Sequence, residues 1–365
     1  MNSLKEPNGG GDNNSSNSTI DETTPKFQLK STLKDLEKAT GVSKSTISRV
    51  FNEPDKVKTS TLQLVKRKAK EIGYIPSRVA RRLQGGIGNA KVIGLIIPDI
   101  LNPFFAEIVR GVEDIAMDKG YSLILNNSDE NVERQRLCLD TLRMEGVDGI
   151  ILPPAEGEDE YVKELVEGGL NIVFIDRKMY NLSVDSILSD NEKGAYIAVS
   201  HLIKLGHKRI AYISGIPSIS TTQERLRGYK KAFKEHGIDL DISLIVMGDS
   251  KQKSGEELTT ELLEMPEPPT AIFTGNNMIT LGAYMAFNRL GVKVPEEVAL
   301  VGYDDVPWAD ALNPRPTVID QSTYEIGRRA AETLISRIQN PESSPVTTMI
   351  NPKLIVRESC GAKEI

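Results

Sequence analysis

The chain has 365 residues, of which 39% are hydrophobic and 26% charged, so we expect two or three domains of ordinary soluble composition. No run approaches the roughly 20 consecutive apolar residues of a membrane span, and the Asn-, Ser- and Gly-rich N-terminus does not resemble a signal peptide. A cytoplasmic protein without membrane association is expected. Cys138 and Cys360 lack the spacing of a disulfide framework or zinc site, and neither a metal nor a cofactor is predicted.

The formal net charge of −6 conceals an asymmetry between two parts of the chain. Residues 30–91 hold 15 Lys and Arg against 5 Asp and Glu, whereas the remainder holds 30 basic and 46 acidic residues. This separation favours a polyanion-binding head on an acidic body. A solvated basic helix face would explain the charge without any such partner.

The N-terminal part of the chain predicts a tail followed by short helices. Residues 1–29 are too polar to offset the entropy cost of ordering, so we expect a disordered tail. Residues 30–75 then show a capping box at Thr32 and Asp35, which opens a first helix that Gly41 ends. This pattern starts a predicted helix-turn-helix domain.

The second and third helices complete that domain. Ser43 caps a helix that runs through Asn52, and apolar residues at helical spacing predict a third helix from Thr59 to Ile72. Residues 76–91 follow as a basic linker, which includes a short segment able to form two helical turns and ends in a glycine-rich stretch. A segment this short is marginal as an isolated helix.

From residue 92 onward, apolar runs alternate with amphipathic helices. Such near-continuous apolar strands are typical of parallel sheets covered on both faces. The length of this part suits two doubly wound α/β lobes rather than one. The strands are predicted at residues 92–98, 121–125, 147–152, 171–175, 209–213, 271–274 and 298–302, with a helix at 103–119.

Motifs spread over the chain resemble the lactose-repressor (LacI/GalR) family of transcriptional regulators. They include Gly-Val-Ser-Lys-Ser-Thr-Ile-Ser-Arg-Val-Phe-Asn (41–52), Glu-Ile-Gly-Tyr-Ile-Pro (71–76), Val-Asp-Gly-Ile-Ile-Leu (147–152) and Val-Gly-Tyr-Asp-Asp (301–305). The resemblance covers Leu33 to Cys360. It implies an all-α DNA-binding head, a hinge helix, and a two-lobed α/β core like a periplasmic binding protein.

The resemblance also implies domain limits. The hinge helix and linker are expected over 76–91, and the order of the hinge should depend on DNA and on a second hinge. The core is expected over 92–365, with one lobe at about 92–189 and 322–349 and the other at about 190–321 and 350–365. Two positions depart from the family. Glu37 replaces a small residue, so its carboxylate must reach solvent or find a basic partner, and Lys58 replaces a capping serine, so Thr59 or Ser60 is the expected cap.

By resemblance, the second helix reads DNA in the major groove. Lys44 and Ser45 hold the positions that choose the operator sequence, and Arg49 is the other base-reading candidate. Leu83 is expected to insert between base steps as an apolar wedge. The remaining candidates for DNA contact, several of them to phosphates, are Thr32, Leu33, Ser43, Thr46, Ser48, Asn52, Thr61, Arg78 and Ala80.

The effector is expected beyond the C-terminal ends of the core strands, where parallel sheets bind ligands. The candidates implied by the resemblance are polar groups suited to hydroxyls, namely Asp99, Asn102, Phe105, Asp176, Arg225, Asn276, Asp304 and Gln321. Ser250 stands where many sugar-responsive members carry an aromatic residue, and Asn277 replaces a common aspartate. The effector is expected to be carbohydrate-derived, which leaves open a smaller, differently oriented, phosphorylated or acidic molecule.

Other functions fit the sequence less well. A solute-binding protein for uptake would carry a signal peptide and no basic head. A dehydrogenase would place Gly85, Gly86 and Gly88 after a strand, and here they precede one. No catalytic constellation is present, so no enzyme is predicted. A regulator of the same fold that answers mainly to a protein partner stays open.

The expected partners are therefore double-stranded DNA with a pseudo-palindromic operator, a small polar effector and a second copy of the chain. Paired hinges and a two-fold operator both require two heads, which predicts a homodimer. A tetramer is not expected, since the sequence shows no heptad pattern that would hold one together.

Overall fold

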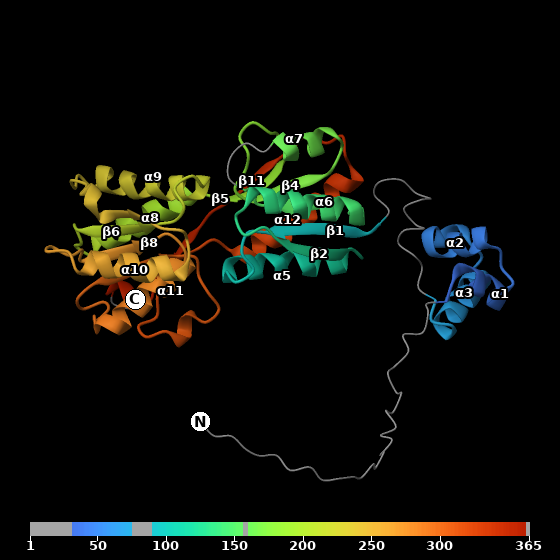
Figure 1. The fold of residues 1–365 in the computed structure, drawn as a ribbon, viewed down its shortest axis with the longest axis horizontal. Helices are drawn as coiled ribbons and strands as arrows, with labels where there is room; N and C mark the ends of the chain where they lie inside the picture. The colour runs from blue at the N-terminus through green and yellow to red at the C-terminus, as the bar shows by residue number, and fades with distance from the viewer. Residues whose placement is uncertain (1–30, 75–89, 156–159, 363–365) are drawn as a thin grey trace, which may run out of the picture. The chain divides into compact units, whose positions relative to one another are not determined.

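The structure is a computed structural model that describes residues 31–74, 90–155 and 160–362 (Figure 1). These residues belong to two compact units that divide between Ala80 and Arg81. The predicted tail at 1–29 lies outside the described residues, as does the hinge up to residue 89 with Arg78, Ala80 and Leu83.

The described residues of the first unit form three α-helices, α1 (Leu33–Thr40), α2 (Lys44–Asn52) and α3 (Thr59–Glu71), with a 3₁₀ turn η1 (Pro54–Lys56). The capping box of α1 is present, since Thr32 Oγ1 accepts from the Asp35 N–H at 3.3 Å and Asp35 Oδ2 accepts from the Thr32 N–H at 2.8 Å. Gly41 ends α1 at φ 68°, a left-handed conformation that glycine adopts without steric cost. The local sequence signals therefore place α1 correctly.

The core of this unit is small. Five apolar side chains from all three helices are buried in it, namely Leu36, Ile47, Val50, Val65 and Ala69. Because the α2 residues Ile47 and Val50 face this core, the residues between and before them are left to the surface.

The predicted cap of α3 is wrong. Lys58 occupies the N-cap position without a capping side chain, and the helix begins at Thr59. The Leu62 N–H donates to the Lys58 carbonyl at 3.0 Å, which already makes Thr59 and Ser60 part of the first turn. Both hydroxyl residues thus have helical backbones and cannot cap the helix from outside it.

The second unit contains two six-stranded sheets. The first has the order β11-β5-β4-β3-β1-β2, with all neighbours parallel. Its strands are β1 (Val92–Ile97), β2 (Ser122–Asn127), β3 (Gly149–Leu152), β4 (Ile172–Asp176), β5 (Asp185–Ser189) and β11 (Thr347–Ile350). We call this sheet and its helices lobe 1.

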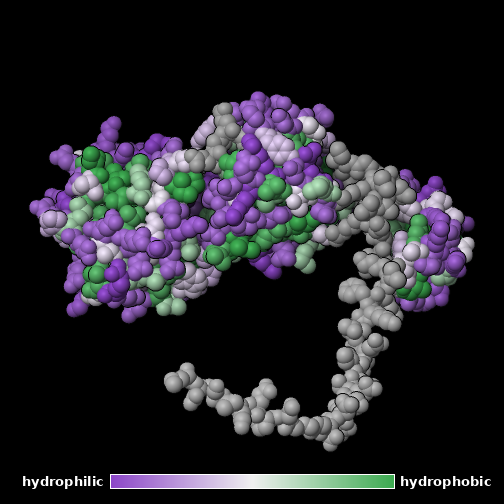
Figure 2. Space-filling view, viewed as in Figure 1, coloured by the Kyte–Doolittle hydropathy of each residue, from purple (hydrophilic) through white to green (hydrophobic). Residues whose placement is uncertain are grey.

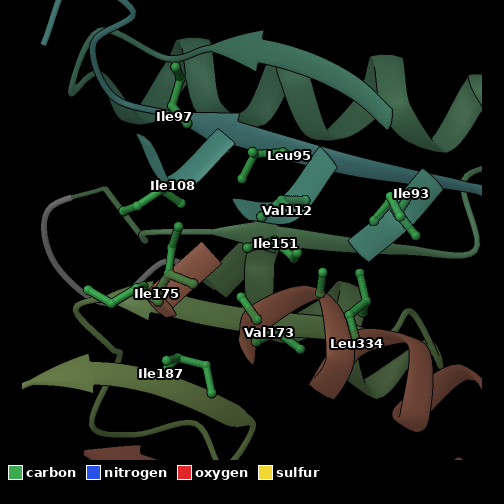
Figure 3. Close-up of a cluster of buried hydrophobic side chains, with 14 of the residues drawn as sticks. Ile93, Leu95, Ile97, Ile108, Val112, Ile151, Val173, Ile175, Ile187 and Leu334 are labelled. Carbon is green, nitrogen blue, oxygen red and sulfur yellow. The ribbon is translucent and has the colours of Figure 1, made fainter. Parts of the chain in front are cut away.

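Each face of the lobe 1 sheet packs against two helices. Helices α5 (Pro103–Asp118) and α12 (Thr323–Gln339) cover one face, with Ile108, Val112 and Leu334 among strand residues such as Leu95 and Val173 (Figure 3). Helices α6 (Val132–Glu145) and α7 (Glu160–Glu167) cover the other face. Burial on both faces explains the continuous apolar runs of β1, β3 and β4.

The second sheet has the order β12-β10-β9-β8-β6-β7 and forms lobe 2. It consists of β6 (Ile210–Ser214), β7 (Ile245–Met247), β8 (Ala271–Thr274), β9 (Ala299–Tyr303), β10 (Thr317–Asp320) and the antiparallel β12 (Lys353–Ile355). Helices α8 (Asn191–Lys204) and α9 (Ser220–Glu235) cover one face, and α10 (Gln252–Leu263) and α11 (Asn277–Leu290) the other. Short 3₁₀ turns η2 (Ile242–Leu244), η3 (Ala309–Ala311) and η4 (Glu358–Cys360) complete it.

The chain crosses between the lobes after β5, after β10 and after β11. Three crossings hold the lobes together, and they bring the C-terminal ends of both parallel sheets to one cleft. Strands β5, β7, β10, β11 and β12 were not predicted from the sequence. They are short or carry polar residues such as Asp185, so they lack the apolar run that marks a buried strand.

Candidate DNA-binding and effector-binding sites

Helix α2 presents its polar side chains at the surface of the first unit. Ser43 is its N-cap and accepts from the Thr46 N–H at 3.4 Å. Lys44, Ser45 and Arg49 are exposed, and Ser45 and Arg49 are four residues apart and so share one face of the helix. Within the described part of the chain, no hydrogen bond or ion pair engages the Arg49 guanidinium, which is therefore available to a partner.

The other predicted DNA contacts of this unit have different surroundings. Thr46, Ser48 and Thr61 are half-buried, and Asn52 ends α2. Thr32 is exposed as the N-cap of α1, whereas Leu33 packs partly against the small core. Because the Leu33 side chain packs against the core, the backbone N–H of Leu33 at the start of α1 is the group of this residue best placed to contact a phosphate.

Glu37 finds a basic partner, as its position required. Its Oε2 lies 3.8 Å from Lys44 Nζ, and both side chains remain about 40% exposed. The other ion pairs of this unit join residues three or four apart on one helix or turn, whereas this pair joins α1 to α2. Glu37 therefore acts on a predicted base-reading residue, a role that the sequence did not assign to it.

The cleft between the lobes contains a cavity of about 420 Å³. Seven of the eight predicted effector residues line it together, although they come from segments up to about 200 residues apart in the chain. These are Asp99, Asn102, Phe105, Asp176, Arg225, Asn276 and Asp304. The volume suits a small molecule of sugar size.

The backbone around this cavity is strained. Of the seven described non-glycine residues with positive φ, five line the cavity, at φ between 53° and 71°, namely Asp129, Glu130, Asp176, Ser250 and Asp304. Such conformations cost free energy and persist where the surrounding structure enforces them, which is typical of binding sites. Their concentration here supports a functional cleft.

Arg225 lies at the base of the cavity and is 7% exposed. It is in the second turn of α9, which begins at Ser220. Its Nε donates to Asn191 Oδ1 at 2.8 Å and its Nη1 to the Gly275 carbonyl at 2.5 Å. Its guanidinium carbon lies 3.8 Å from the centre of the Tyr303 ring, so the side chain is held rigidly.

Gln321 is not among the residues that line the cavity. Its Nε2 donates to Asp304 Oδ1 at 2.6 Å, and the side chain is 1% exposed. Gln321 thus orients the Asp304 carboxylate without itself lining the cavity. Asn277, also buried, donates from Nδ2 to Asn102 Oδ1 at 2.9 Å and so links α11 of lobe 2 to the N-cap of α5 in lobe 1.

Asp176 and Asp304 are both buried at the cavity. Burial raises the pKa of Asp176 to about 6, against the opposing influence of Arg177 and Arg225. Burial also raises the pKa of Asp304, although Arg225 and the hydrogen bond from Gln321 work against this. The charged form of such a buried carboxylate is stabilised when a ligand donates hydrogen bonds to it.

Several cavity residues were missed in the sequence. Arg177 donates from Nη2 to both Glu130 oxygens at 2.9 and 2.7 Å, and Lys251 Nζ lies 3.7 Å from Asp129 Oδ1. The predicted second strand ended at residue 125, whereas β2 extends to Asn127, and this error hid the loop that follows. Polar residues just beyond a correctly ended strand would have been the signal.

Among the described residues, no group of three or more His, Cys, Asp or Glu side chains could hold a metal ion. In the same part of the chain, no helix is long and apolar enough to cross a membrane.

Two family models match the chain. Residues 32–77 match bacterial regulatory proteins of the lacI family, and residues 90–358 match the periplasmic binding proteins and sugar-binding domain of the LacI family. The two matches correspond to the helical unit and to the two-lobed unit. Together they cover most of the chain.

Individual proteins are similar over nearly the whole length. The transcriptional repressor PurR of Photobacterium profundum is 33% identical over 329 residues, covering 90% of this chain and 98% of that protein. A structure of the regulator CelR with cellobiose is 32% identical at TM-score 0.68, covering 90% of this chain and all of that one.

A structure of the lac repressor dimer bound to operator and an anti-inducer is 26% identical, with TM-score 0.79 over 92% of this chain and all of that chain. The predicted fold, a helix-turn-helix head and a two-lobed periplasmic-binding-protein-like core, is confirmed. The protein is a DNA-binding transcriptional regulator, not an enzyme. The chain belongs to the LacI family of bacterial transcriptional regulators.

Proposed function

We propose that the cleft binds a small carbohydrate-derived effector and that its occupancy sets the affinity of the head for an operator. The observation that carries this proposal is the convergence of Asp176, Arg225 and Asp304 on one cavity with strained backbone. Carboxylates accept hydrogen bonds from sugar hydroxyls, and a guanidinium donates to them. The cellobiose complex of a similar regulator supports the same ligand class.

On the DNA side, we propose Lys44, Ser45 and Arg49 as base contacts. Ser43, Thr46, Ser48 and Asn52 would hold phosphates, with Thr32, Leu33 and Thr61 nearby. In the segment outside the described residues, Arg78 and Ala80 would contact DNA and Leu83 would insert between base steps. The domain limits predicted from the sequence, 30–75, 76–91 and 92–365, are proposed as the functional units.

We further propose a homodimer on a pseudo-palindromic operator in the bacterial cytoplasm. Strands β2 and β7 each form one edge of their sheet. Exposed apolar side chains lie on these strands (Leu125 and Met247), in η2 (Ile242) and at the two ends of α5 (Leu101 and Met117). Figure 2 shows hydrophobic residues gathered over α5 and β2 on the visible face. Sedimentation equilibrium at micromolar concentration should give a dimer, and a tetramer would contradict the proposal.

A metabolite screen tests the effector. The full chain is heated with sugars, sugar acids, sugar phosphates and nucleosides, since a ligand that binds only the folded state raises Tm. Hits are then titrated by calorimetry and tested for their effect on DNA binding. A ligand that is not a sugar would correct the proposed ligand class. If no compound of the panel raises Tm, control by a protein partner would be favoured.

A further inference from the structure

The cavity in the cleft has an excess of negative charge. Three cationic side chains line it, against six acidic ones, which are Asp99, Asp129, Glu130, Asp176, Asp249 and Asp304. Two of the six, Asp176 and Asp304, are less than one-tenth exposed, so water screens them poorly. When charges of one sign line a cleft whose walls have a low dielectric constant, the electric field inside the cleft is strong and acts on any ligand that enters it.

The three cations are already engaged by the protein. Arg177, 6% exposed as a side chain, has a two-fold hydrogen bond from Nη2 to Glu130. Lys251 lies across the cleft from lobe 1 and pairs with Asp129. Arg225 donates to Asn191 and Gly275 and lies under the influence of Asp304 and Asp176. An incoming anion would have to compete with a protein carboxylate for Arg177 and for Lys251, and with the oxygens of Asn191 and Gly275 for Arg225.

The Asp176 carboxylate, unlike these cations, lacks a hydrogen-bonding partner in the described part of the chain. The residue is 8% exposed and lines the cavity. A buried carboxylate without donors is costly unless a ligand supplies them. Hydroxyl and ammonium groups supply such donors, whereas a phosphate or carboxylate adds repulsion.

We infer that the cleft selects its effector by charge, accepting an uncharged polyol or one with a protonated amine and excluding phosphorylated and carboxylated sugars. The inference rests on the proposed function in taking the cleft as the effector site. Of the alternatives that the sequence left open, the phosphorylated and acidic sugar derivatives are the two that this charge selection disfavours.

A smaller neighbouring cavity offers a competing arrangement. It measures about 210 Å³, shares Arg177 and Ile219 with the main cavity, and also contains Lys178. Because Glu130 already neutralises Arg177, Lys178 alone would have to hold an anionic group there. Binding of a sugar phosphate across both cavities is therefore the result that would contradict the inference.

The electrostatic potential of the cleft can be measured without knowing the effector. Ser250→Cys places a thiol in the cavity, and Ser183→Cys places a matched thiol on an exposed loop of the same unit. Each variant reacts with a cationic trimethylammonium-ethyl and an anionic sulfonatoethyl methanethiosulfonate. The native cysteines are buried, so wild-type protein provides the blank. Taking the ratio of the two rates cancels differences in thiol pKa.

We expect the ratio of cationic to anionic rate to be about tenfold higher at position 250 than at position 183. Adding Glu130→Gln, which frees Arg177, should lower the ratio at position 250. Equal ratios at the two positions, a faster anionic reaction in the cleft, or no response to Glu130→Gln would each overturn the inference.

A ligand comparison provides the second arm. D-ribose, D-glucose and D-glucosamine are compared with ribose 5-phosphate, glucose 6-phosphate and glucuronate by thermal shift on the full chain. A larger shift from a neutral or amino sugar than from its anionic counterpart supports the inference, and the reverse overturns it. If no sugar shifts Tm while the thiol rates favour cations, the proposed sugar class fails and the charge selection stands.

Discussion

The helical unit and the two-lobed unit place their charges in different ways. In the described helical unit, ten Lys and Arg stand against five Asp and Glu, and its ion pairs are largely exposed. In the core, Arg225, Arg177 and Asp176 are each less than one-tenth exposed. Exposed charge is available to a polyanion at little cost to folding, whereas buried charge is held by the fold and constrains what can bind.

This difference predicts that loss of a charge in the core affects folding, while loss of a charge in the head affects DNA binding. Four substitutions test the contrast, beginning with the largest expected effect.

Arg225→Ala should destabilise the core by about 3–5 kcal/mol, because Asp176 and Asp304 would remain buried without their shared cation. Urea unfolding of the full chain measures it. Arg227→Ala on the same helix is the matched control, since Arg227 is 54% exposed and should cost about 1 kcal/mol or less. Equal losses from the two variants would remove the distinction between buried and exposed charge.

Asp176→Asn should stabilise the core at neutral pH by up to about 3 kcal/mol, which corresponds to a pKa raised from 3.8 to about 6. A carboxyl with a raised pKa in the folded state binds more protons folded than unfolded, so wild-type stability should fall as pH rises from about 4 to 6. The variant should lack that part of the slope. Glu130, Arg177, Arg225 and Asp304 face the same carboxyl and stay unchanged. Thermal unfolding of both proteins across this pH range measures the difference. If the stability of the two proteins changed with pH in parallel, the prediction would be wrong.

Arg49→Ala should cost about 1–3 kcal/mol of specific DNA binding and relax the preference at one operator position. Operators are obtained by selection from random duplexes, and affinity is measured on single-base variants. Lys68→Ala should instead weaken all sequences alike and only modestly, because Lys68 already pairs with Glu71 at 2.6 Å. A uniform loss in both variants would show that Arg49 does not read a base.

Glu37→Gln should have the smallest effect on folding, below about 1 kcal/mol, because its pair with Lys44 is exposed. Removing the carboxylate frees Lys44, so affinity for random DNA should rise. The slope of log affinity against log salt concentration should also become steeper, by an amount that corresponds to at most about one additional phosphate contact. Titrations at several salt concentrations measure this. Glu53→Gln, whose partner Lys56 lies three residues away on the same turn, is the control for a pair that does not involve α2.

Local sequence patterns determined much of this protein. The capping box at Thr32 and Asp35, the cap at Ser43 and the apolar runs of β1, β3, β4, β6, β8 and β9 act over a few residues, so the sequence alone located them. The rule that ligands bind beyond the ends of parallel strands, together with the family resemblance, was enough to predict seven of the residues that line the cavity.

Tertiary structure decided what depends on distant partners. Strand β5 has a buried Asp185 that no apolar pattern predicts, because its charge is balanced by Arg337 of α12 at 2.8 Å across 152 residues. The pairs Arg177–Glu130 and Lys44–Glu37 join separate segments in the same way. Since a charge can be buried or neutralised only where its partner arrives in space, the fold and not the sequence decided which charges in both sites are paired and which are available to a ligand.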